Sequence, residues 1–508
     1  MLFVDIMRRK AELFMDMELH NELEPEYTPS SSPNPRRRKK TKLQVFKEAY
    51  LPLIIVAFTF VLVVVFIIGG IRGNDSADTT SNSTNPSTQP SSSTTNSTVP
   101  PETMELQAEA EALMAQAAAL LPDYDYAGAL AILDTFSGDM ALFPELSAVY
   151  AQYQAELDSM VEWTGSQVVN LSFQLLIADP ERAFQDATYS KQYRNNFITV
   201  TEFSAILQQL YDNDYILVSL SDLYESVHDE SSDRDIWVAK TLLLPPGKTP
   251  VMLTETNANY YAYMVDPDKN GTPDANAAGF AYKLCYDGQE GFYNELVLAD
   301  GTVVKGAYDM VPLLEAFIAK HPDFSYRDAR AIIAFSGYDG VLGYRLYSSK
   351  LTPAQQLEEQ AAAAAVVNAL RETGYDIACF TYGNSNKGTL NYGELDPEAI
   401  LADLQLWKEK ITPVIGETNI FVFAKEDDIA GEESYIGNAK FNAMHNENYG
   451  NFDFFLSTGT APWDQVDKEY VRHNRLMVTG AYLQKYPERF AELFDPAAVL
   501  DPYRENFN

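Results

Sequence analysis

The chain has 508 residues, of which 46% are apolar and 21% are charged, an ordinary globular composition that suffices for a hydrophobic core. Its formal net charge of −35 arises almost wholly after residue 50. Residues 1–50 carry 10 Lys/Arg against 8 Asp/Glu, and the rest of the chain carries 27 against 64. Such an acidic surface repels phosphate backbones, so we expect no nucleic-acid partner. The length predicts two or three structural units.

An uncharged stretch at residues 50–71 is rich in Leu, Ile, Val and Phe. Its length suffices to cross a hydrocarbon core of about 30 Å. The basic run Arg36–Lys40 precedes it, whereas only Arg72 follows it closely. By the positive-inside rule, the tail 1–49 is cytoplasmic and the C-terminus lies outside. The sequence therefore predicts a single-pass protein of the cell membrane with a large extracytoplasmic region.

Two segments separate this stretch from the main domain. Residues 72–103 are mostly Ser, Thr, Asn and Pro, a composition that predicts a flexible stalk. Residues 104–162 predict a small all-α, hairpin-like unit, because leucines recur every seven residues from Leu106 to Leu120 and a second apolar helical face runs from Leu146 to Leu157. Between them, Asp123–Leu130 is similar to the second helix of a tetratricopeptide hairpin.

Strand-like and helical segments alternate in residues 163–508, which predicts an α/β fold with a parallel sheet and helical crossovers. Thr199–Glu202 has the pattern of a capping box, and Asp396 with Pro397 that of a helix start. Where such a sheet closes into a parallel barrel, the functional site lies at the carboxyl ends of the strands. The strand-like runs are 168–173, 215–220, 251–254, 330–335, 375–380, 419–423 and 452–457, and the main helical patterns after residue 300 are 311–320, 353–373 and 396–411.

The only cysteines are Cys285 and Cys379. A disulfide between them is one interpretation. Cys379 lies in the apolar run Ile377–Phe380, which favours a buried free thiol at that position.

Several long segments resemble a known family. Leu176–Phe184, Leu207–Ser219, Leu244–Lys248 and Phe335–Arg345 resemble the polysaccharide deacetylase (NodB-homology) family in its membrane-anchored bacterial form, from about residue 168 to the C-terminus. The resemblance implies a distorted (β/α)7 barrel that removes acetyl groups from amino sugars. In that family a strand-end Asp-Asp pair supplies a general base and a metal ligand. A later His-x-x-x-His supplies two more ligands, and the metal activates water.

This chain departs from the family at each of these positions. Thr256 and Asn257 stand in place of the Asp-Asp pair, and Phe380 and Asn384 in place of the two histidines. Neither Thr nor Asn can serve as a carboxylate base, and Phe cannot bind a metal. Ala424–Asp427 corresponds to the Arg-x-Pro-type segment, and Thr479 to a late aspartate. We therefore expect degenerate metal and catalytic motifs and no catalytic metal.

The histidines give independent support for this expectation. None of the four after the stalk pairs at the i, i+4 spacing that places two imidazoles on one helix face. They are His228, His321, His445 and His473.

A second pattern resembles the start of a calcium loop. Asp266–Asp274 matches D-x-D-x-N-G with an oxygen ligand at the ninth position, but the twelfth position is Ala277 instead of Glu. A structural calcium ion and a plain acidic turn are both open. The candidate ligands are Asp266, Asp268, Asn270, Thr272 and Asp274.

Tyrosines lie beside the degenerate motif. Tyr260, Tyr261 and Tyr263 could stack on sugar rings in a glycan cleft, or simply pack the barrel rim. The leading hypothesis is a catalytically degenerate, deacetylase-like protein that binds a cell-wall glycan or an envelope protein. One alternative is an active hydrolase with a non-standard site, such as Glu255 or the cluster Lys425–Asp428. Another is an envelope scaffold acting through the helical unit.

The expected topology can be tested on intact cells. A protease added from outside should digest the region after Ile71 and spare residues 1–48, because only the C-terminal part is expected to be extracytoplasmic. Immunoblots against tags at the two ends would measure this. A C-terminal tag that stays protected until the membrane is permeabilised would contradict the predicted orientation.

Overall fold

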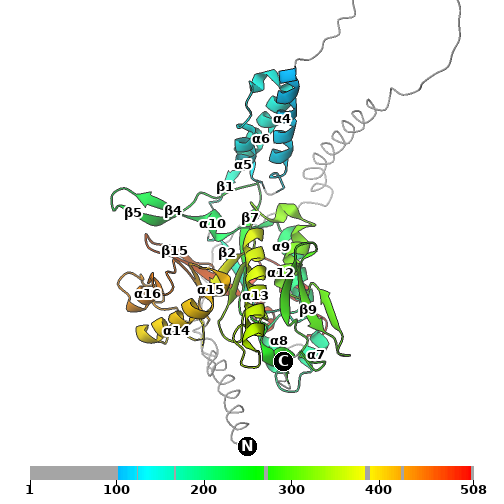
Figure 1. The fold of residues 1–508 in the computed structure, drawn as a ribbon, viewed down its shortest axis with the longest axis vertical. Coiled ribbons are helices and arrows are strands. Elements are labelled where there is room, and N and C mark those ends of the chain that lie inside the picture. The colour runs from blue at the N-terminus through cyan, green and yellow to red at the C-terminus, as the bar shows by residue number, and fades with distance from the viewer. Residues whose placement is uncertain are drawn as a thin grey trace, which may run out of the picture. The chain divides into compact units, whose positions relative to one another are not determined.

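The computed structural model describes residues 101–122, 124–164, 167–267, 273–383, 390–424 and 428–504 (Figure 1). The expected cytoplasmic tail, the expected membrane-spanning stretch and nearly all of the expected stalk lie outside these residues. Within the described ranges, no helix has both the length and the apolar character of a membrane span.

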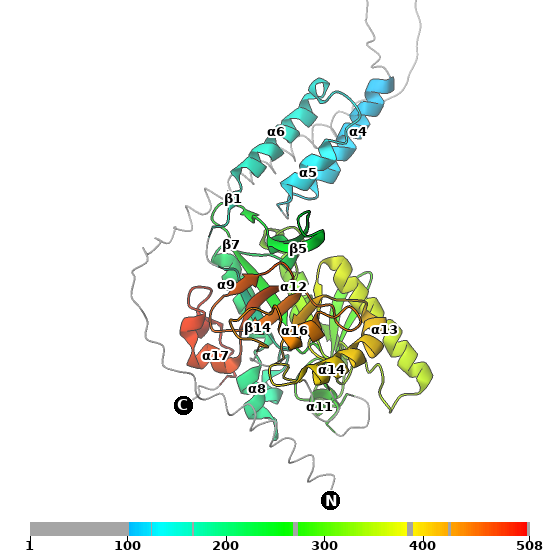
Figure 2. The same cartoon turned by 90° about the vertical axis from the view of Figure 1, so that its left-hand side faces the viewer.

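The described part of the helical unit contains α4 (Pro101–Ala118), α5 (Tyr126–Leu133) and α6 (Pro144–Ser159), which pack on one another (Figure 2). The Asp125 carboxylate accepts a hydrogen bond from the Gly128 amide at 3.1 Å and so caps the start of α5. Small side chains allow the helices to approach closely. Their shared core contains Ala110, Ala117, Ala129, Leu130, Leu133 and Leu146.

The main domain is a closed barrel of seven parallel strands. Each strand pairs with the next around the circle, and pairing between β7 and β11 completes the ring. The parallel α/β sheet expected from the alternating pattern is therefore confirmed, and so is the seven-stranded barrel that the resemblance implies. In order around the ring, the strands are β2 (Val169–Phe173), β7 (Thr249–Glu255), β11 (Ile332–Phe335), β12 (Asp376–Cys379), β13 (Ile420–Val422), β14 (Phe454–Thr458) and β16 (Val471–Met477).

The ring is distorted at β7. On one side β7 pairs with β2, and on the other side its first residues pair with the short strand β3 (Tyr215–Leu217) while Thr254 and Glu255 pair with β11. The chain therefore crosses over β7 between β2 and β3. A parallel bridge from Leu217 to Ser325 continues the line of β3 toward β11.

Strand residues alternate between the barrel lumen and an outer layer, because successive side chains of a strand point to opposite faces. Both faces are buried, so the strands are nearly continuous apolar runs in the sequence. Lumen side chains include Met252, Ala334, Ala378, Val422 and Leu456. Outward side chains, packed under helices, include Leu253, Phe335, Cys379, Phe421 and Phe455.

Helices cover the outer layer, and Figure 1 shows α13 (Pro353–Thr373) running alongside the strands. α13 has the predicted bounds and ends at Gly374, whose φ of +106° suits glycine. α9 (Val200–Asp212) begins with the predicted capping box of Thr199 and Glu202. The other helices described in the main domain are α7 (Pro180–Phe184), α8 (Ser190–Asn196), α10 (Leu220–Leu223), whose leucines pack with the lumen side chains, α11 (Ala262–Val265), α12 (Met310–Ile318), α14 (Pro397–Lys410), α15 (Thr412–Ile415), α16 (Ala439–Met444), α17 (Gly480–Lys485) and α18 (Pro496–Val499).

Antiparallel additions decorate the barrel and were not predicted from the sequence. They are the three-stranded sheet of β8 (Lys283–Asp287), β9 (Gly291–Val297) and β10 (Val303–Gly306), the hairpin of β4 (Tyr224–Asp229) and β5 (Arg234–Ala239), the pair β1 (Val161–Glu162) with β6 (Leu243–Leu244), and β15 (Asp464–Val466) beside β16. Both cysteines are free and buried, which confirms the buried thiol expected at Cys379.

A buried ion pair ties the C-terminal segment to the barrel. Arg504 donates from Nε to one Glu202 carboxylate oxygen at 2.6 Å and from Nη2 to the other at 2.7 Å. Glu202 also accepts the amides of Thr199 and Asp501. Both charged side chains are fully buried, so each depends on the other for its counter-charge.

Removing Arg504 should therefore be costly. We expect Arg504→Met to lower the free energy of unfolding by about 3–5 kcal/mol, because it leaves an unpaired buried carboxylate. Arg234→Met breaks the more exposed pair with Glu469 at 2.7 Å and should cost about 1 kcal/mol or less. Urea unfolding of the full chain in detergent measures both changes. Similar small costs for the two variants would contradict the role assigned to Arg504.

Candidate functional site

The carboxyl ends of the barrel strands bring together the positions singled out in the sequence. Thr256 directly follows β7, and its hydroxyl donates to the Phe173 carbonyl at 3.1 Å, so it is engaged with the backbone of β2. Phe380 directly follows β12 and is buried in the lumen. Asn257 has a φ of +59°, which turns the chain sharply after β7. Thr256 therefore bonds to the backbone, Phe380 supplies a hydrophobic side chain, and Asn257 forms a turn.

The remaining family-equivalent positions are placed differently. Asn384 lies outside the described residues. Thr479 caps α17, because its hydroxyl oxygen accepts the amide of Tyr482 at 3.1 Å. Of the alternative cluster Lys425–Asp428, only Asp428 is described. It pairs with Arg472 at 2.8 Å and accepts the Tyr435 hydroxyl at 2.6 Å.

The predicted calcium loop is described only at its ends, since Asp268, Asn270 and Thr272 lie outside the described residues. Asp266 is buried, and the Lys350 ammonium lies 3.5 Å from its carboxylate. The amide of Asp274 donates to the Val265 carbonyl at 2.8 Å, which closes the base of the loop. Elsewhere too, the described residues contain no group of three or more His, Cys, Asp or Glu arranged to hold a metal. Calcium binding stays a prediction.

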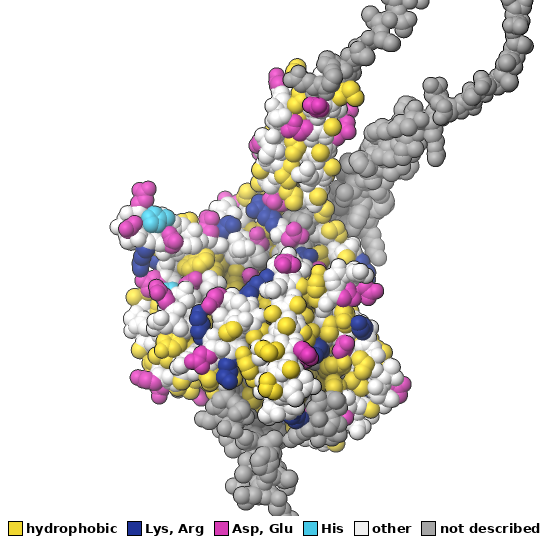
Figure 3. All heavy atoms as spheres, in the orientation of Figure 1, with side chains coloured by type: hydrophobic (Ala, Val, Ile, Leu, Met, Phe, Trp, Pro, Cys, Tyr) yellow, Lys and Arg dark blue, Asp and Glu magenta, His cyan; other side chains and the backbone are white. Residues whose placement is uncertain are grey.

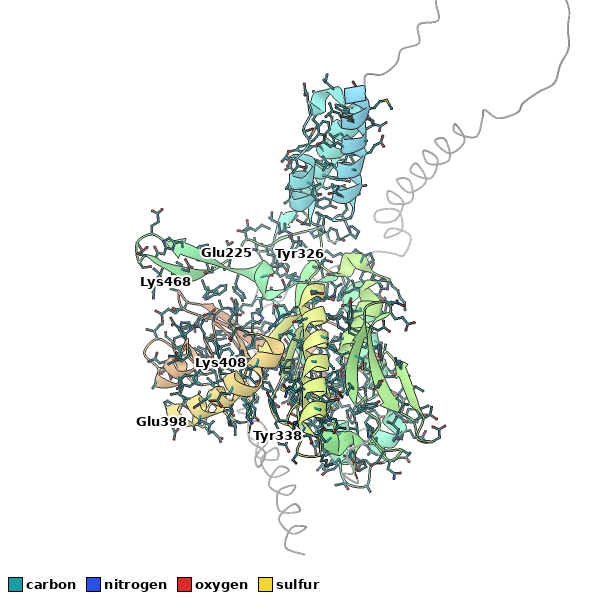
Figure 4. The ribbon with its side chains drawn as sticks, viewed as in Figure 1. Glu225, Tyr326, Tyr338, Glu398, Lys408 and Lys468 are labelled. Carbon is teal, nitrogen blue, oxygen red and sulfur yellow. The ribbon has the colours of Figure 1, made fainter. Side chains whose placement is uncertain are left out.

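Four tyrosines form a rim cluster after the strand ends: Tyr189, Tyr261, Tyr263 and Tyr338. The rings of Tyr261 and Tyr263 stack with centroids 5.9 Å apart and an interplanar angle of 23°. Tyr189 contacts Tyr263 at 5.5 Å, and Tyr338 contacts Tyr261 at 6.0 Å. Tyr263 is 36% exposed and the other three are partly exposed. Figure 4 labels Tyr338 at the end of the barrel that lies lowest in the view.

Tyr260 does not belong to this rim, which corrects the grouping made from the sequence. It is only 2% exposed, and its ring packs in the outer layer behind the barrel wall. Its φ of +51° directs the chain so that adjacent tyrosines point to opposite environments. The side-chain nitrogen of Asn294 donates a hydrogen bond to the Tyr260 hydroxyl at 3.1 Å. Tyr260 therefore has no ring face free for a sugar.

Asn259 holds the loops that carry the rim, and the sequence analysis did not single it out. Its side-chain nitrogen donates to the carbonyls of Ser336, Tyr338 and Gly340, and its side-chain oxygen accepts the Ser336 amide at 3.0 Å. Arg345 adds bonds to the carbonyls of the same two loops. One buried amide thus ties the loop after β7 to the loop after β11. An asparagine in an irregular loop gives little advance signal of such a role.

Glu255, proposed above as an alternative catalytic group, faces away from the lumen. It is 1% exposed in the outer layer, where it contacts Asp309 at the start of α12. Asp309 accepts the amides of Leu176 and Met310, each at 2.9 Å. Burial raises the pKa of Asp309 to about 6 and raises that of Glu255 well above its usual range. The geometry suits two carboxyl groups that share a proton.

This pair should make stability depend on pH. Between about pH 4, where free carboxyls titrate, and about pH 6, the folded state holds more protons than the unfolded state. The pair therefore stabilises the fold below about pH 4, and this contribution falls as the pH rises. A Glu255→Gln/Asp309→Asn double variant should lose this dependence.

Urea unfolding of the wild type and the double variant from pH 4 to 7 isolates the pair, because other buried carboxyls titrate in both proteins. The wild type should lose up to about 1.4 kcal/mol per pH unit relative to the double variant for each proton involved. Glu225→Gln, on the exposed hairpin strand β4, is the matched control and should follow the wild type. Parallel curves for the wild type and the double variant would contradict proton sharing.

The chain was also compared with known proteins. No protein-family model, no curated protein and no solved structure matches it. The site is therefore defined by its own geometry: a closed parallel barrel whose carboxyl end carries a cluster of partly exposed tyrosines.

Proposed function

We propose that this protein is a membrane-anchored, extracytoplasmic polysaccharide deacetylase-like protein of the cell envelope, and that its barrel binds glycan without metal-dependent hydrolysis. The observation that carries the proposal is the rim cluster. Its four tyrosines lie at the carboxyl end of a parallel barrel, where barrels of this kind bind their ligands. Stacked, partly exposed aromatic rings match the apolar faces of sugar rings.

The positions that would carry hydrolysis support a binding role. Deacetylation needs a base to take a proton from water and a cation to stabilise the oxyanion, and loss of one such group commonly costs about 10²-fold. At these positions Thr256 is bonded to backbone and Phe380 fills the lumen. Glu255 is buried against Asp309 in the outer layer, and Asp428 is neutralised by Arg472. Among the described residues, these candidates leave no carboxylate free at the strand ends.

A scaffold role for the helical unit has one specific observation in its favour. Residues 101–162 contain twelve Asp or Glu and no Lys, Arg or His. On the face drawn in Figure 3, the helical unit shows acidic and apolar side chains, whereas the barrel also carries basic ones. A basic envelope protein is the partner that this charge would attract.

Glycan binding by the rim cluster can be measured directly. Tyr263→Ala and Tyr338→Ala should each weaken binding of acetylated chitooligosaccharides or peptidoglycan fragments about two- to tenfold, because a stacked ring contributes about 0.5–1.5 kcal/mol. Tyr286→Ala is the matched control: this tyrosine is 41% exposed but lies on the three-stranded antiparallel sheet. Calorimetric titration of the full chain gives the affinities. Equal affinities for all four proteins would remove the rim cluster as the binding site.

The same glycans test the absence of hydrolysis. With zinc, cobalt or nickel supplied, we expect binding without release of acetate. Turnover that disappears on chelation would overturn the degenerate-enzyme part of the proposal, while leaving the binding result to stand by itself.

A further inference from the structure

Three arginines of the main domain are almost completely buried, and two of them have a carboxylate partner. Arg472 pairs with Asp428 at 2.8 Å, and Arg504 pairs with Glu202. Arg475, which is 2% exposed, has no carboxylate within ion-pair distance among the described residues. Within the described residues, two of the three buried guanidinium groups are thus neutralised, and the third contacts only neutral acceptors.

Arg475 lies in the lumen, on the same strand as Arg472 but on the opposite face. Its hydrogen bonds go to the Ser172 hydroxyl at 2.7 Å, the Phe423 carbonyl at 2.9 Å and the Leu456 carbonyl at 3.4 Å. All three acceptors are neutral, and a guanidinium has five N–H donors. Burial lowers the pKa of Arg475 to about 9, which reflects the cost of holding its charge away from water.

The neighbours of Arg475 in the lumen carry polar atoms without partners. By strand register, Arg475 lies between Thr458 on β14 and Asn170 on β2. The Thr458 hydroxyl and the side-chain nitrogen of Asn170 are buried and have no hydrogen-bond partner among the residues that the structure describes. The oxygen of Asn170 already accepts the Thr254 hydroxyl at 2.8 Å, so its nitrogen is the group left to donate. In the described part of the chain, Arg475 and two polar atoms without a hydrogen-bond partner therefore lie at one level of three adjacent strands.

We infer that the barrel lumen binds a small, singly charged anion of halide size, held by Arg475 between Asn170 and Thr458. The donors supply the hydrogen bonds that such an anion accepts, and its charge neutralises the guanidinium. A single charge fits because one cation faces it. A small ion fits because apolar side chains, including Phe380, Val422 and Leu456, occupy the surrounding lumen. This inference does not depend on glycan binding.

Chloride is the probe for a stability test. The full chain in detergent should melt at a temperature about 2 °C or more higher in 100 mM chloride than in 100 mM gluconate at equal ionic strength, because a ligand of the folded state stabilises it. Arg475→Met should abolish the difference. Arg472→Met, which removes a buried arginine with its own carboxylate, should retain it. Equal melting temperatures of the wild type in the two salts would overturn the inference, as would loss of the response in both variants.

Two further measurements hold even where Arg475→Met does not fold. Thr458→Val keeps the shape of the side chain and removes one donor, so it should raise the half-saturating chloride concentration several-fold. Crystals of the wild type grown in bromide should give an anomalous peak within hydrogen-bond distance of the Arg475 guanidinium. A lumen without this peak would show that neutral groups alone solvate Arg475, and the inference would be wrong.

Discussion

Closure of the barrel at β7 is the constraint on which the rest of the structure depends. Because β7 pairs with β2 on one side and with β3 and then β11 on the other, the ring closes and each strand residue is assigned to the lumen or to the outer layer. A shift of the strand pairing by one residue would exchange the lumen-facing side chains with the outward-facing ones. The alternation sends Thr254 into the lumen beside Asn170 and Glu255 outward against Asp309. The register therefore decides which polar side chains lie in the lumen and which lie behind the barrel wall.

The register also separates charge in an unusual way. The buried carboxyls at Glu255 and Asp309 lie outside the barrel wall, where sharing a proton lets them avoid full ionisation. Arg475, which has no carboxylate partner in the part of the chain that the structure describes, lies inside the barrel, and it stays charged because an arginine keeps its proton at neutral pH. The carbonyls of Phe423, just after β13, and of Leu456, in the middle of β14, stabilise it in part. A buried positive charge thus stands inside a protein whose net charge is −35.

The sequence could predict elements whose local signals agree with their tertiary setting. The bounds of α13 and the capping box of α9 agree with the prediction, because capping and helix propensity act within a few residues. β16 was missed because Val471–Met477 contains four polar residues, and these are buried or half-buried for reasons that only the closed ring supplies. Tyr260 was misplaced because a left-handed residue reverses the direction of its neighbours. The role of Asn259 depends on a loop 77 residues away.

A net charge of −35 should repel anions, so affinity for an anion in the lumen must come from nearby groups. The interaction energies of close and distant charges favour binding through nearby groups. At 4 Å and an effective dielectric constant of 20, two unit charges interact by about 4 kcal/mol. Surface carboxylates are dispersed and partly paired with Lys or Arg, and at physiological ionic strength charges separated by more than about 8 Å of solvent are largely screened. A contact with Arg475 therefore outweighs the distant field, and the acidic surface would slow entry of the anion more than it would weaken its binding.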